Sequence, residues 1–160
     1  MKAATLAEIK KELKHKSEEE LLFYCLSLSR FKKENKELLT YLLFEASDEE
    51  SYIQSVKAEI DLQFSDINNQ NYYWMKKTTR KVLRLTRKYI RYSKKKTTEV
   101  ELLIYFCQKM LSLSPSIKEN TVLNNLYERL IVSIRKTISK MEEDLQYDYT
   151  LQLDEILVKK

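Results

Sequence analysis

Glycine is absent from all 160 residues of this chain, and proline occurs once, at Pro115. Tight β-hairpin turns, β-bulges and phosphate-binding loops need positive φ or a close approach of the main chain, which glycine provides at the lowest cost. The chain therefore lacks the glycine patterns of a P-loop and of a dinucleotide-binding fold. A single proline leaves long helices uninterrupted. This composition predicts an all-α protein.

The expected helices are marked by their start signals. Five Ser or Thr residues are followed three positions later by Glu, which is the pattern of a capping box. Apolar residues repeat every three to four positions between these signals, as they do in helices that pack on one face. The pairs are Thr5–Glu8, Ser17–Glu20, Ser47–Glu50, Thr98–Glu101 and Ser116–Glu119. The predicted helices span residues 6–14, 18–30, 36–46, 48–64, 72–93, 99–113, 117–146 and 150–158.

Length and composition indicate one folded domain. A chain of 160 residues is long enough to enclose a sizeable core, and 43% hydrophobic with 33% charged residues is typical of globular proteins. The stretches 65–71 and 112–116 are the best candidates for linkers between helices. We therefore expect a single all-α domain over residues 1–160, with about seven or eight helices.

Two parts of the chain resemble each other. Residues 17–25, SEEELLFYC, are similar to residues 98–107, TEVELLIYFC. A true repeat would give two related halves, about 5–64 and 72–158, arranged as a short solenoid-like stack of α-α hairpins. Helices rich in Lys, Glu and Leu also resemble one another by composition alone, and the fold would then be an irregular helical bundle. The sequence leaves both alternatives open.

A resemblance to a known family is carried by residues 6–43, LAEIKKELKHKSEEELLFYCLSLSRFKKENKELLTYLL. This stretch resembles the start of an uncharacterised family of small, wholly helical bacterial proteins. The shared pattern is L-x-E-[IL]-K-K-E-L-K, then Ser with acidic residues, then NKE and a Tyr-Leu pair. Residues 89–107, YIRYSKKKTTEVELLIYFC, also fit that family. The resemblance implies an all-α fold and a bacterial source, and it implies no function.

Residue types that carry catalysis or bind metals are scarce. His15, the only histidine, lies in a charged stretch and is expected to be an exposed turn residue. Cys25 and Cys107 lie within apolar helical patterns, where we expect both thiols to be buried. No Cys-x-x-Cys pair, Glu-x-x-His pair or glycine-containing acidic loop supports a metal site. We predict that the protein is not an enzyme and has no catalytic residue, metal ligand or cofactor.

Three acidic clusters have structural explanations. The clusters at 18–20 and 48–50 begin predicted helices, where negative charge complements the helix dipole. The cluster at 142–144 falls near the end of a long predicted helix and is expected to be solvated surface.

The sequence also indicates where the protein resides. Mean hydropathy is −0.52, and no apolar run approaches the roughly 18 residues that a membrane span requires. Residues 1–14 lack the apolar core of a signal peptide. We therefore expect a cytoplasmic protein.

The most uneven feature of the sequence is a basic segment. No acidic residue occurs between Asp66 and Glu99, and eleven Lys and Arg lie in that interval although the net charge is only +5, so the remainder carries a formal −6. On a helical wheel, residues 75–95 separate into an apolar and a basic side. On the apolar side, the residues at the spacing of a packing seam are Met75, Thr78, Val82, Leu85, Tyr89 and Tyr92. The ten residues of the basic face are Lys76, Lys77, Arg80, Lys81, Arg84, Arg87, Lys88, Arg91, Lys94 and Lys95.

The positive charges of the basic face repel one another, so an anionic partner or acidic neighbours would stabilise it. Like charges four residues apart cost roughly 0.2–0.5 kcal/mol per pair in an isolated helix. The face therefore either binds an anion or is neutralised by acidic neighbouring helices. Tyr73 projects to the basic side and Trp74 to its edge, where an aromatic ring could stack on a base.

We interpret the protein as a non-enzymatic binding protein that uses the cationic helix face at about 72–95 for an anionic partner. Nucleic acid is slightly preferred over an acidic protein, because Lys and Arg follow phosphates and Arg binds them bidentately. An anionic membrane ranks last, since three threonines and a seam pattern indicate that the apolar side is already packed. The alternative is a structural or protein-interaction scaffold whose basic face is neutralised by its own acidic helices or by an acidic protein. No small-molecule substrate is evident, and the oligomeric state is left open.

Overall fold

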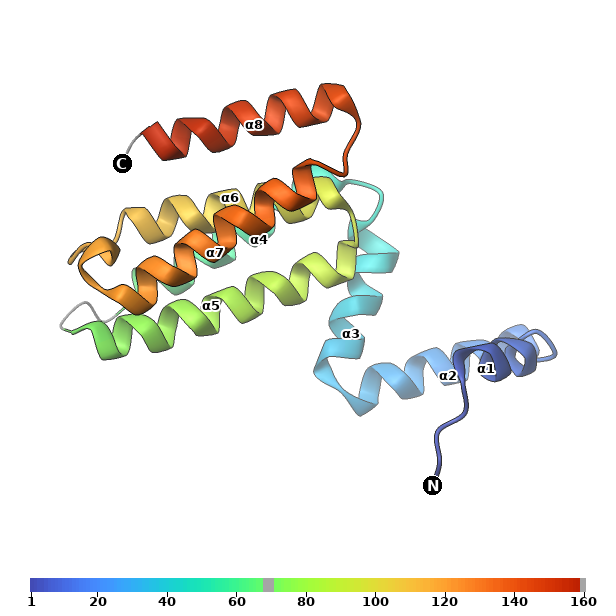
Figure 1. Cartoon of the computed structure of the whole chain (residues 1–160). Coiled ribbons are helices and arrows are strands. Elements are labelled where there is room, and N and C mark those ends of the chain that lie inside the picture. Colours follow the sequence, from blue (N-terminus) through green and yellow to red (C-terminus); the bar gives the residue numbers. More distant parts are fainter. Residues whose placement is uncertain (68–70, 159–160) are drawn as a thin grey trace. The chain divides into compact units, whose positions relative to one another are not determined.

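The computed structural model describes residues 1–67 and 71–158. These residues form helices and short connections, with no strand among them, so the predicted all-α fold is confirmed (Figure 1). The chain divides into two compact units, unit 1 (Met1–Phe44) and unit 2 (Glu45–Lys160).

Unit 1 contains three α-helices. They are α1 (Leu6–Leu13), α2 (Glu18–Phe31) and α3 (Lys33–Thr40), and a π-helical turn, η1 (Tyr41–Glu45), follows them. The predicted capping boxes before α1 and α2 are confirmed. The hydroxyls of Thr5 and Ser17 accept hydrogen bonds from backbone N–H groups at 3.3 and 3.2 Å, and the Glu three residues on accepts one from each cap N–H.

Unit 1 is described throughout, and none of its three α-helices buries a residue. Cys25 is exposed, so the prediction that both thiols are buried is wrong for this one. A segment this short encloses too little volume to bury all of its apolar positions, and Phe23 and Phe31 are exposed as well. His15 lies in the exposed turn between α1 and α2, as expected.

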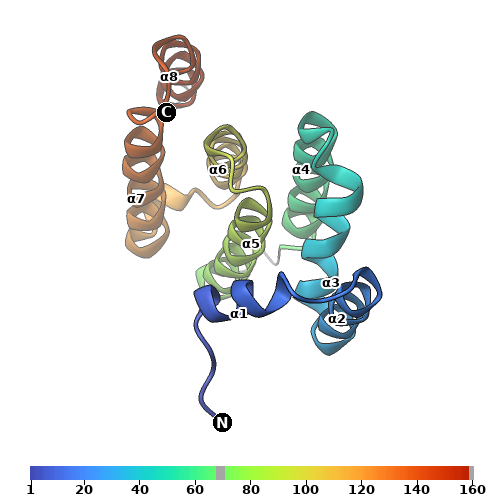
Figure 2. The same ribbon diagram turned by 90° about the vertical axis from the view of Figure 1, so that its right-hand side faces the viewer.

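Unit 2 is a helical bundle in which successive α-helices run in alternating directions (Figure 1). The view along the helices in Figure 2 places α6 between α4 and α7. α6 contacts each of the other four α-helices of the unit, which gives the bundle its core. The elements are α4 (Glu49–Ser65), α5 (Tyr72–Ser93), α6 (Lys96–Leu111), the short 3₁₀ helix η2 (Ile117–Glu119), α7 (Thr121–Ile138) and α8 (Glu143–Val158).

The core of unit 2 is built around α6, because this helix is covered on several sides. Leu102, Phe106, Cys107 and Met110 have no exposed surface. Burying a large apolar side chain stabilises a fold by roughly 1.5–3 kcal/mol. The prediction that Cys107 is buried is therefore confirmed.

Two predicted helix starts in unit 2 are wrong. Asp48, and not Ser47, caps α4, and its carboxylate accepts a hydrogen bond from the N–H of Ser51 at 3.1 Å. Thr98 lies inside α6, which begins two residues earlier at Lys96. The Thr98 side chain is fully buried, and its hydroxyl donates a hydrogen bond to Glu49 of α4 instead of capping α6.

The predicted helix at 117–146 is also wrong, because the chain breaks twice within it. Ser116 caps only the short η2, and α7 follows as a separate helix that ends at Ile138. The next helix, α8, includes the whole of the stretch predicted at 150–158. The acidic cluster at 142–144 consequently lies at the start of α8, where the helix dipole favours it, and not at the end of a long helix.

Two further expectations concern the linker at 65–71 and the two internal halves. Of the predicted linker at 65–71, residues 68–70 lie outside the described residues. The division between the units falls after Phe44, which is a different position from the division between the expected halves. The internal repeat stays a prediction.

Candidate anion-binding groove

The helix that carries the basic face, α5, has a buried and an exposed side, as its sequence predicts. Asn71 caps it by accepting a hydrogen bond from the N–H of Trp74 at 3.1 Å. No member of the basic face is buried. The packing seam is shifted from the predicted one, because Thr78, Leu85 and Tyr89 are only half-buried. The buried residues of α5 are Met75, Thr79, Val82, Leu83, Thr86 and Tyr92.

The C-terminal end of the basic face is attached to α4. Lys94 ends α5 with φ 60° and ψ 6°, the left-handed conformation in which glycine is usual after a helix. The next residue, Lys95, pairs with Glu49 of α4, with 2.8 Å between Nζ and Oε2. Glu49 also accepts hydrogen bonds from the hydroxyls of Ser93 and Thr98. Of the basic face, Lys95 therefore has an acidic partner within unit 2.

A groove runs along the other part of α5. α5 and α7 each pack against α6. A cavity of about 630 Å³ is lined by residues of α5 and by one residue of α7. Five cations of the basic face line it, together with one tyrosine and two leucines. We call this the basic groove, and its lining residues are Tyr73, Lys76, Lys77, Arg80, Leu83, Arg84, Arg87 and Leu126.

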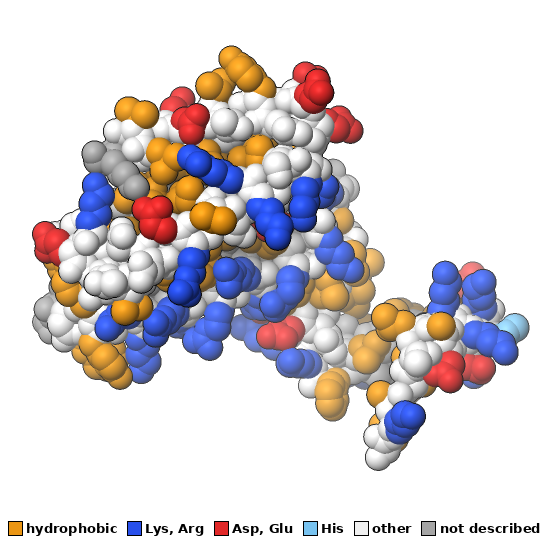
Figure 3. Space-filling view, in the orientation of Figure 1, with side chains coloured by type: hydrophobic (Ala, Val, Ile, Leu, Met, Phe, Trp, Pro, Cys, Tyr) orange, Lys and Arg blue, Asp and Glu red, His pale blue; other side chains and the backbone are white. Residues whose placement is uncertain are grey.

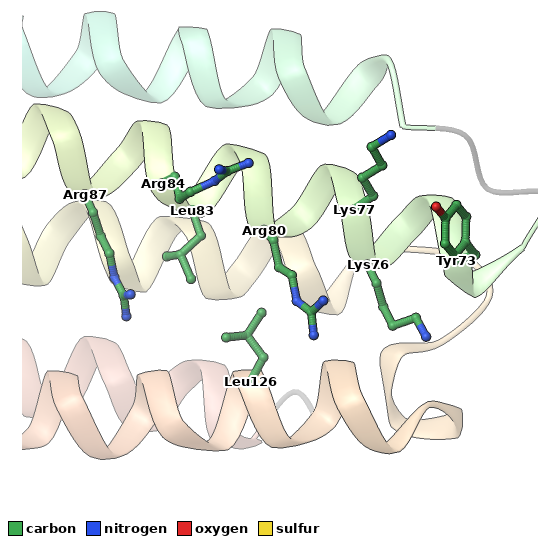
Figure 4. Close-up of a pocket in the computed structure, with 8 residues that line it drawn as sticks. All are labelled: Tyr73, Lys76, Lys77, Arg80, Leu83, Arg84, Arg87 and Leu126. Carbon is green, nitrogen blue, oxygen red and sulfur yellow. The ribbon is translucent and has the colours of Figure 1, made fainter. Parts of the chain in front are cut away.

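The side chains of the basic groove are arranged around an apolar centre (Figure 4). Leu83 of α5 and Leu126 of α7 point toward each other. Lys76, Arg80 and Arg87 extend toward α7, whereas Lys77 and Arg84 extend to the other side of α5 in this view. Figure 3 shows Lys and Arg side chains gathered along this part of the surface. An anion between α5 and α7 would therefore meet Lys76, Arg80 and Arg87 beside an apolar centre.

Among the residues that the structure describes, no acidic side chain forms an ion pair with a cation of the basic groove. No acidic residue among 1–67 and 71–158 lines the groove either. Acidic residues of unit 2 pair with lysines elsewhere, as in Lys57–Glu101 at 3.5 Å and Lys109–Asp61 at 2.8 Å. Members of the basic face without an ion pair to a described residue are Lys76, Lys77, Arg80, Lys81, Arg84, Arg87, Arg91 and Lys94.

Two exposed aromatic rings lie at the N-terminal end of the groove. Tyr73 is 62% exposed and Trp74 is 41% exposed. Their rings meet edge to face, with centroids 5.1 Å apart. The ammonium of Lys77 lies 5.1 Å from the centroid of the Trp74 ring, within the range of a cation–π interaction. Tyr73 lines the groove, and Trp74 adjoins it without lining it.

Part of the predicted basic face lies outside the groove. The members of the basic face that do not line the groove are Lys81, Lys88, Arg91, Lys94 and Lys95. The ammonium of Lys88 lies 4.9 Å from the centroid of the Tyr89 ring. The two leucines were not predicted as site residues, because their approach depends on how α5 and α7 pack against α6.

A second cluster of titratable side chains links α4 to α6. The hydroxyl of Tyr105 donates to the Asp61 carboxylate at 2.6 Å, and Lys109 pairs with the same carboxylate. Burial and the hydrogen bond to Asp61 raise the pKa of Tyr105, so that its hydroxyl stays protonated. Each charged group here is paired, and the cluster serves to join two helices.

The described residues offer few other sites. They contain no group of three or more His, Cys, Asp or Glu side chains that could hold a metal ion. None of the described helices has both the length and the apolar character needed to cross a membrane. Burial raises the pKa of the Cys107 thiol to about 12, which suppresses the reactive thiolate.

No protein-family model, curated protein or solved structure gives a significant match to this sequence. The resemblance of residues 6–43 to small helical bacterial proteins stays an expectation.

Proposed function

We propose that the protein binds nucleic acid through the basic groove and catalyses no reaction. The observation that carries this proposal is that five cations line one groove while no described acidic residue pairs with any of them. Folding this helix brings like charges together at a cost of roughly 0.2–0.5 kcal/mol for each pair four residues apart. A polyanion would remove that cost and gain charge-assisted hydrogen bonds from the arginines.

The linear arrangement of the cations supports nucleic acid over an acidic protein. Arg87 lies eleven residues after Lys76 on one helix, or roughly 16 Å further along its axis at about 1.5 Å per residue. A phosphate backbone presents its charges in such a line, at regular intervals. An acidic protein is the second candidate, and the apolar pair Leu83 and Leu126 would then receive a hydrophobic side chain of that partner.

The buried side of α5 opposes membrane binding. An interfacial helix needs a bulky apolar face that is free to insert between lipids. In α5, Met75, Thr79 and Val82 have no exposed surface, because they are packed within the bundle. Location in the cytoplasm, which the sequence predicts, is a separate part of the proposal.

The missing ion pairs also support binding over a purely structural role. A scaffold whose basic face is neutralised internally would pair its arginines with acidic residues of α4, α6 or α7. In unit 2 the described pair of this kind joins Lys95 to Glu49, at the far end of the face from the aromatic rings.

Paired charge reversals on one helix test the proposal. The groove variant replaces Arg80 and Arg87 by Glu. The matched control replaces Lys81 and Arg91 by Glu, because these two residues are also exposed on α5 but do not line the groove. We expect the groove variant to weaken binding of an oligonucleotide on the order of 100-fold, because two charged hydrogen-bonding contacts are lost. The control should change affinity severalfold at most. Equal losses in both variants would contradict the assignment to the groove.

A further inference from the structure

We infer that the basic groove takes an unpaired strand of nucleic acid rather than a duplex, with one base on Tyr73 and the following phosphates on the cations of α5. This inference rests on the proposed function and names the ligand class of the same site.

The position of α5 in the bundle argues against reading of duplex DNA. A helix that reads a duplex enters the major groove, which is about 12 Å wide, and a helix with its side chains is itself about 10–12 Å across. Such a helix must protrude. α5 instead packs against α4 and α6, and Leu126 of α7 lines the groove beside it. The site is a groove, whereas recognition of a duplex requires a protruding helix.

At the centre of the groove, the half-buried Leu126 beside the buried Leu83 offers an apolar contact to exposed bases. Leu83 and Leu126 point toward each other between the cations (Figure 4). A duplex keeps its base faces stacked inside and offers a protein surface mainly its charged backbone. An unpaired strand exposes the faces of its bases, which bury against apolar and aromatic side chains.

The aromatic end of the groove supplies a stacking surface. Tyr73 is 62% exposed, lines the groove, and is held edge to face by Trp74 at 5.1 Å. A positively charged groove that continues into exposed aromatic rings is the usual combination in proteins that bind single strands. Both rings lie at the N-terminal end of α5, so the strand is expected to bind with a base at that end and its backbone running toward Arg87.

The length of the groove sets the size of the site. Tyr73 to Arg87 covers roughly 21 Å along α5 at about 1.5 Å per residue. Lys76, Arg80 and Arg87, which extend toward α7, follow one another at roughly 6 and 10 Å along the helix axis, distances that one or two phosphates of an extended strand can match. The site therefore covers about three or four nucleotides, near the lower end of the range for single-strand binding domains.

Fluorescence anisotropy with the full chain tests this inference. The probes are short labelled pyrimidine strands of DNA and of RNA, and a hairpin duplex with the same number of nucleotides. We expect either strand to bind at least tenfold more tightly than the duplex. Replacing Tyr73 by Ala should weaken strand binding by about 5- to 150-fold, the range for loss of one stacked base, while heparin binding is unchanged. Tyr73→Phe should keep the affinity, because it keeps the ring.

The control is Tyr147→Ala, since Tyr147 is 67% exposed on α8 and does not line the groove. It should leave strand binding unchanged. Equal or tighter binding of the duplex, or full strand binding by Tyr73→Ala, would overturn the inference and leave the proposed function standing. Failure to bind strand and duplex alike would overturn both. A preference for RNA or for DNA would identify the source of the strand and support the inference in either case.

Discussion

Replacing Arg80 by Glu is expected to stabilise the free protein while it weakens nucleic-acid binding. Arg80 is exposed on α5, with Lys76 four residues before it and Arg84 four residues after it. None of the three forms an ion pair with a described residue. The side chain therefore contributes repulsion to the folded protein, and its attraction is available only to a ligand.

The size of the effect follows from these two neighbours. Each like-charged pair four residues apart costs roughly 0.2–0.5 kcal/mol, and each opposite pair contributes about the same amount of stability. The substitution removes two repulsions and adds two attractions, so the free energy of unfolding should rise by about 1–2 kcal/mol at low salt. For a chain of this length, that corresponds to an increase in Tm of roughly 2–8 °C.

Thermal unfolding followed by circular dichroism measures this difference. The wild type, Arg80→Glu and Arg80→Gln are compared at about 10 mM and about 1 M salt, where the Debye length falls from about 30 to about 3 Å. Arg80→Gln serves as the control, because it removes the repulsions without adding attractions. It should give about half of the stabilisation at low salt, and all three proteins should converge at high salt.

The opposite result would refute the reasoning. If Arg80→Glu has a lower Tm than the wild type at low salt, then acidic groups neutralise Arg80 in the folded protein. A gain in Tm that does not depend on salt would mean that the effect is not electrostatic. Either result would favour the structural scaffold over the binding protein.

Three further predictions concern the core of unit 2 and the thiols. Thr79→Val should raise the free energy of unfolding by about 1 kcal/mol, because Thr79 Oγ1 is buried without a hydrogen-bond partner among the described residues; urea denaturation checks this. Ile134→Ala should lower the free energy of unfolding by about 2–5 kcal/mol, since Ile134 is fully buried, whereas Val132→Ala, at a site 67% exposed, should change it by under about 0.5 kcal/mol. In the native protein, a thiol reagent should modify the exposed Cys25 and leave the buried Cys107 unmodified until denaturant is added, as peptide mass spectrometry would show.

The sequence predicts the fold class well because its strongest signals are local. The absence of glycine excludes most β-structure, and the capping boxes at Thr5 and Ser17 form within a single helical turn. The break between α7 and α8 has no such local signal, so the sequence does not predict it. Residues 139–142 contain neither glycine nor proline, and the apolar spacing continues through Met141. Beyond the break, α8 packs back against α6 and α7, and these tertiary contacts are not visible in a local pattern.

The candidate site also has features that follow from local periodicity and features that depend on tertiary contacts. Helical periodicity was sufficient to place the cations on one side of α5 and Tyr73 beside them. Periodicity could not identify Leu126, which comes from a different helix, nor show which cations would be neutralised. The acidic residues Glu101 and Asp61 pair with lysines of other helices, and those pairings depend on tertiary contacts.

The salt dependence of strand binding tests the central claim most directly. The logarithm of the association constant falls linearly with the logarithm of the salt concentration, with a slope of about −0.7 for each phosphate neutralised in a single strand. A site of three or four nucleotides, with one groove cation near each phosphate, therefore predicts a slope of roughly −2 to −3 for the wild type. The double reversal of Arg80 and Arg87 should reduce its magnitude by more than one. Binding that does not change with salt, or no binding at low salt, would contradict a nucleic-acid site in this groove.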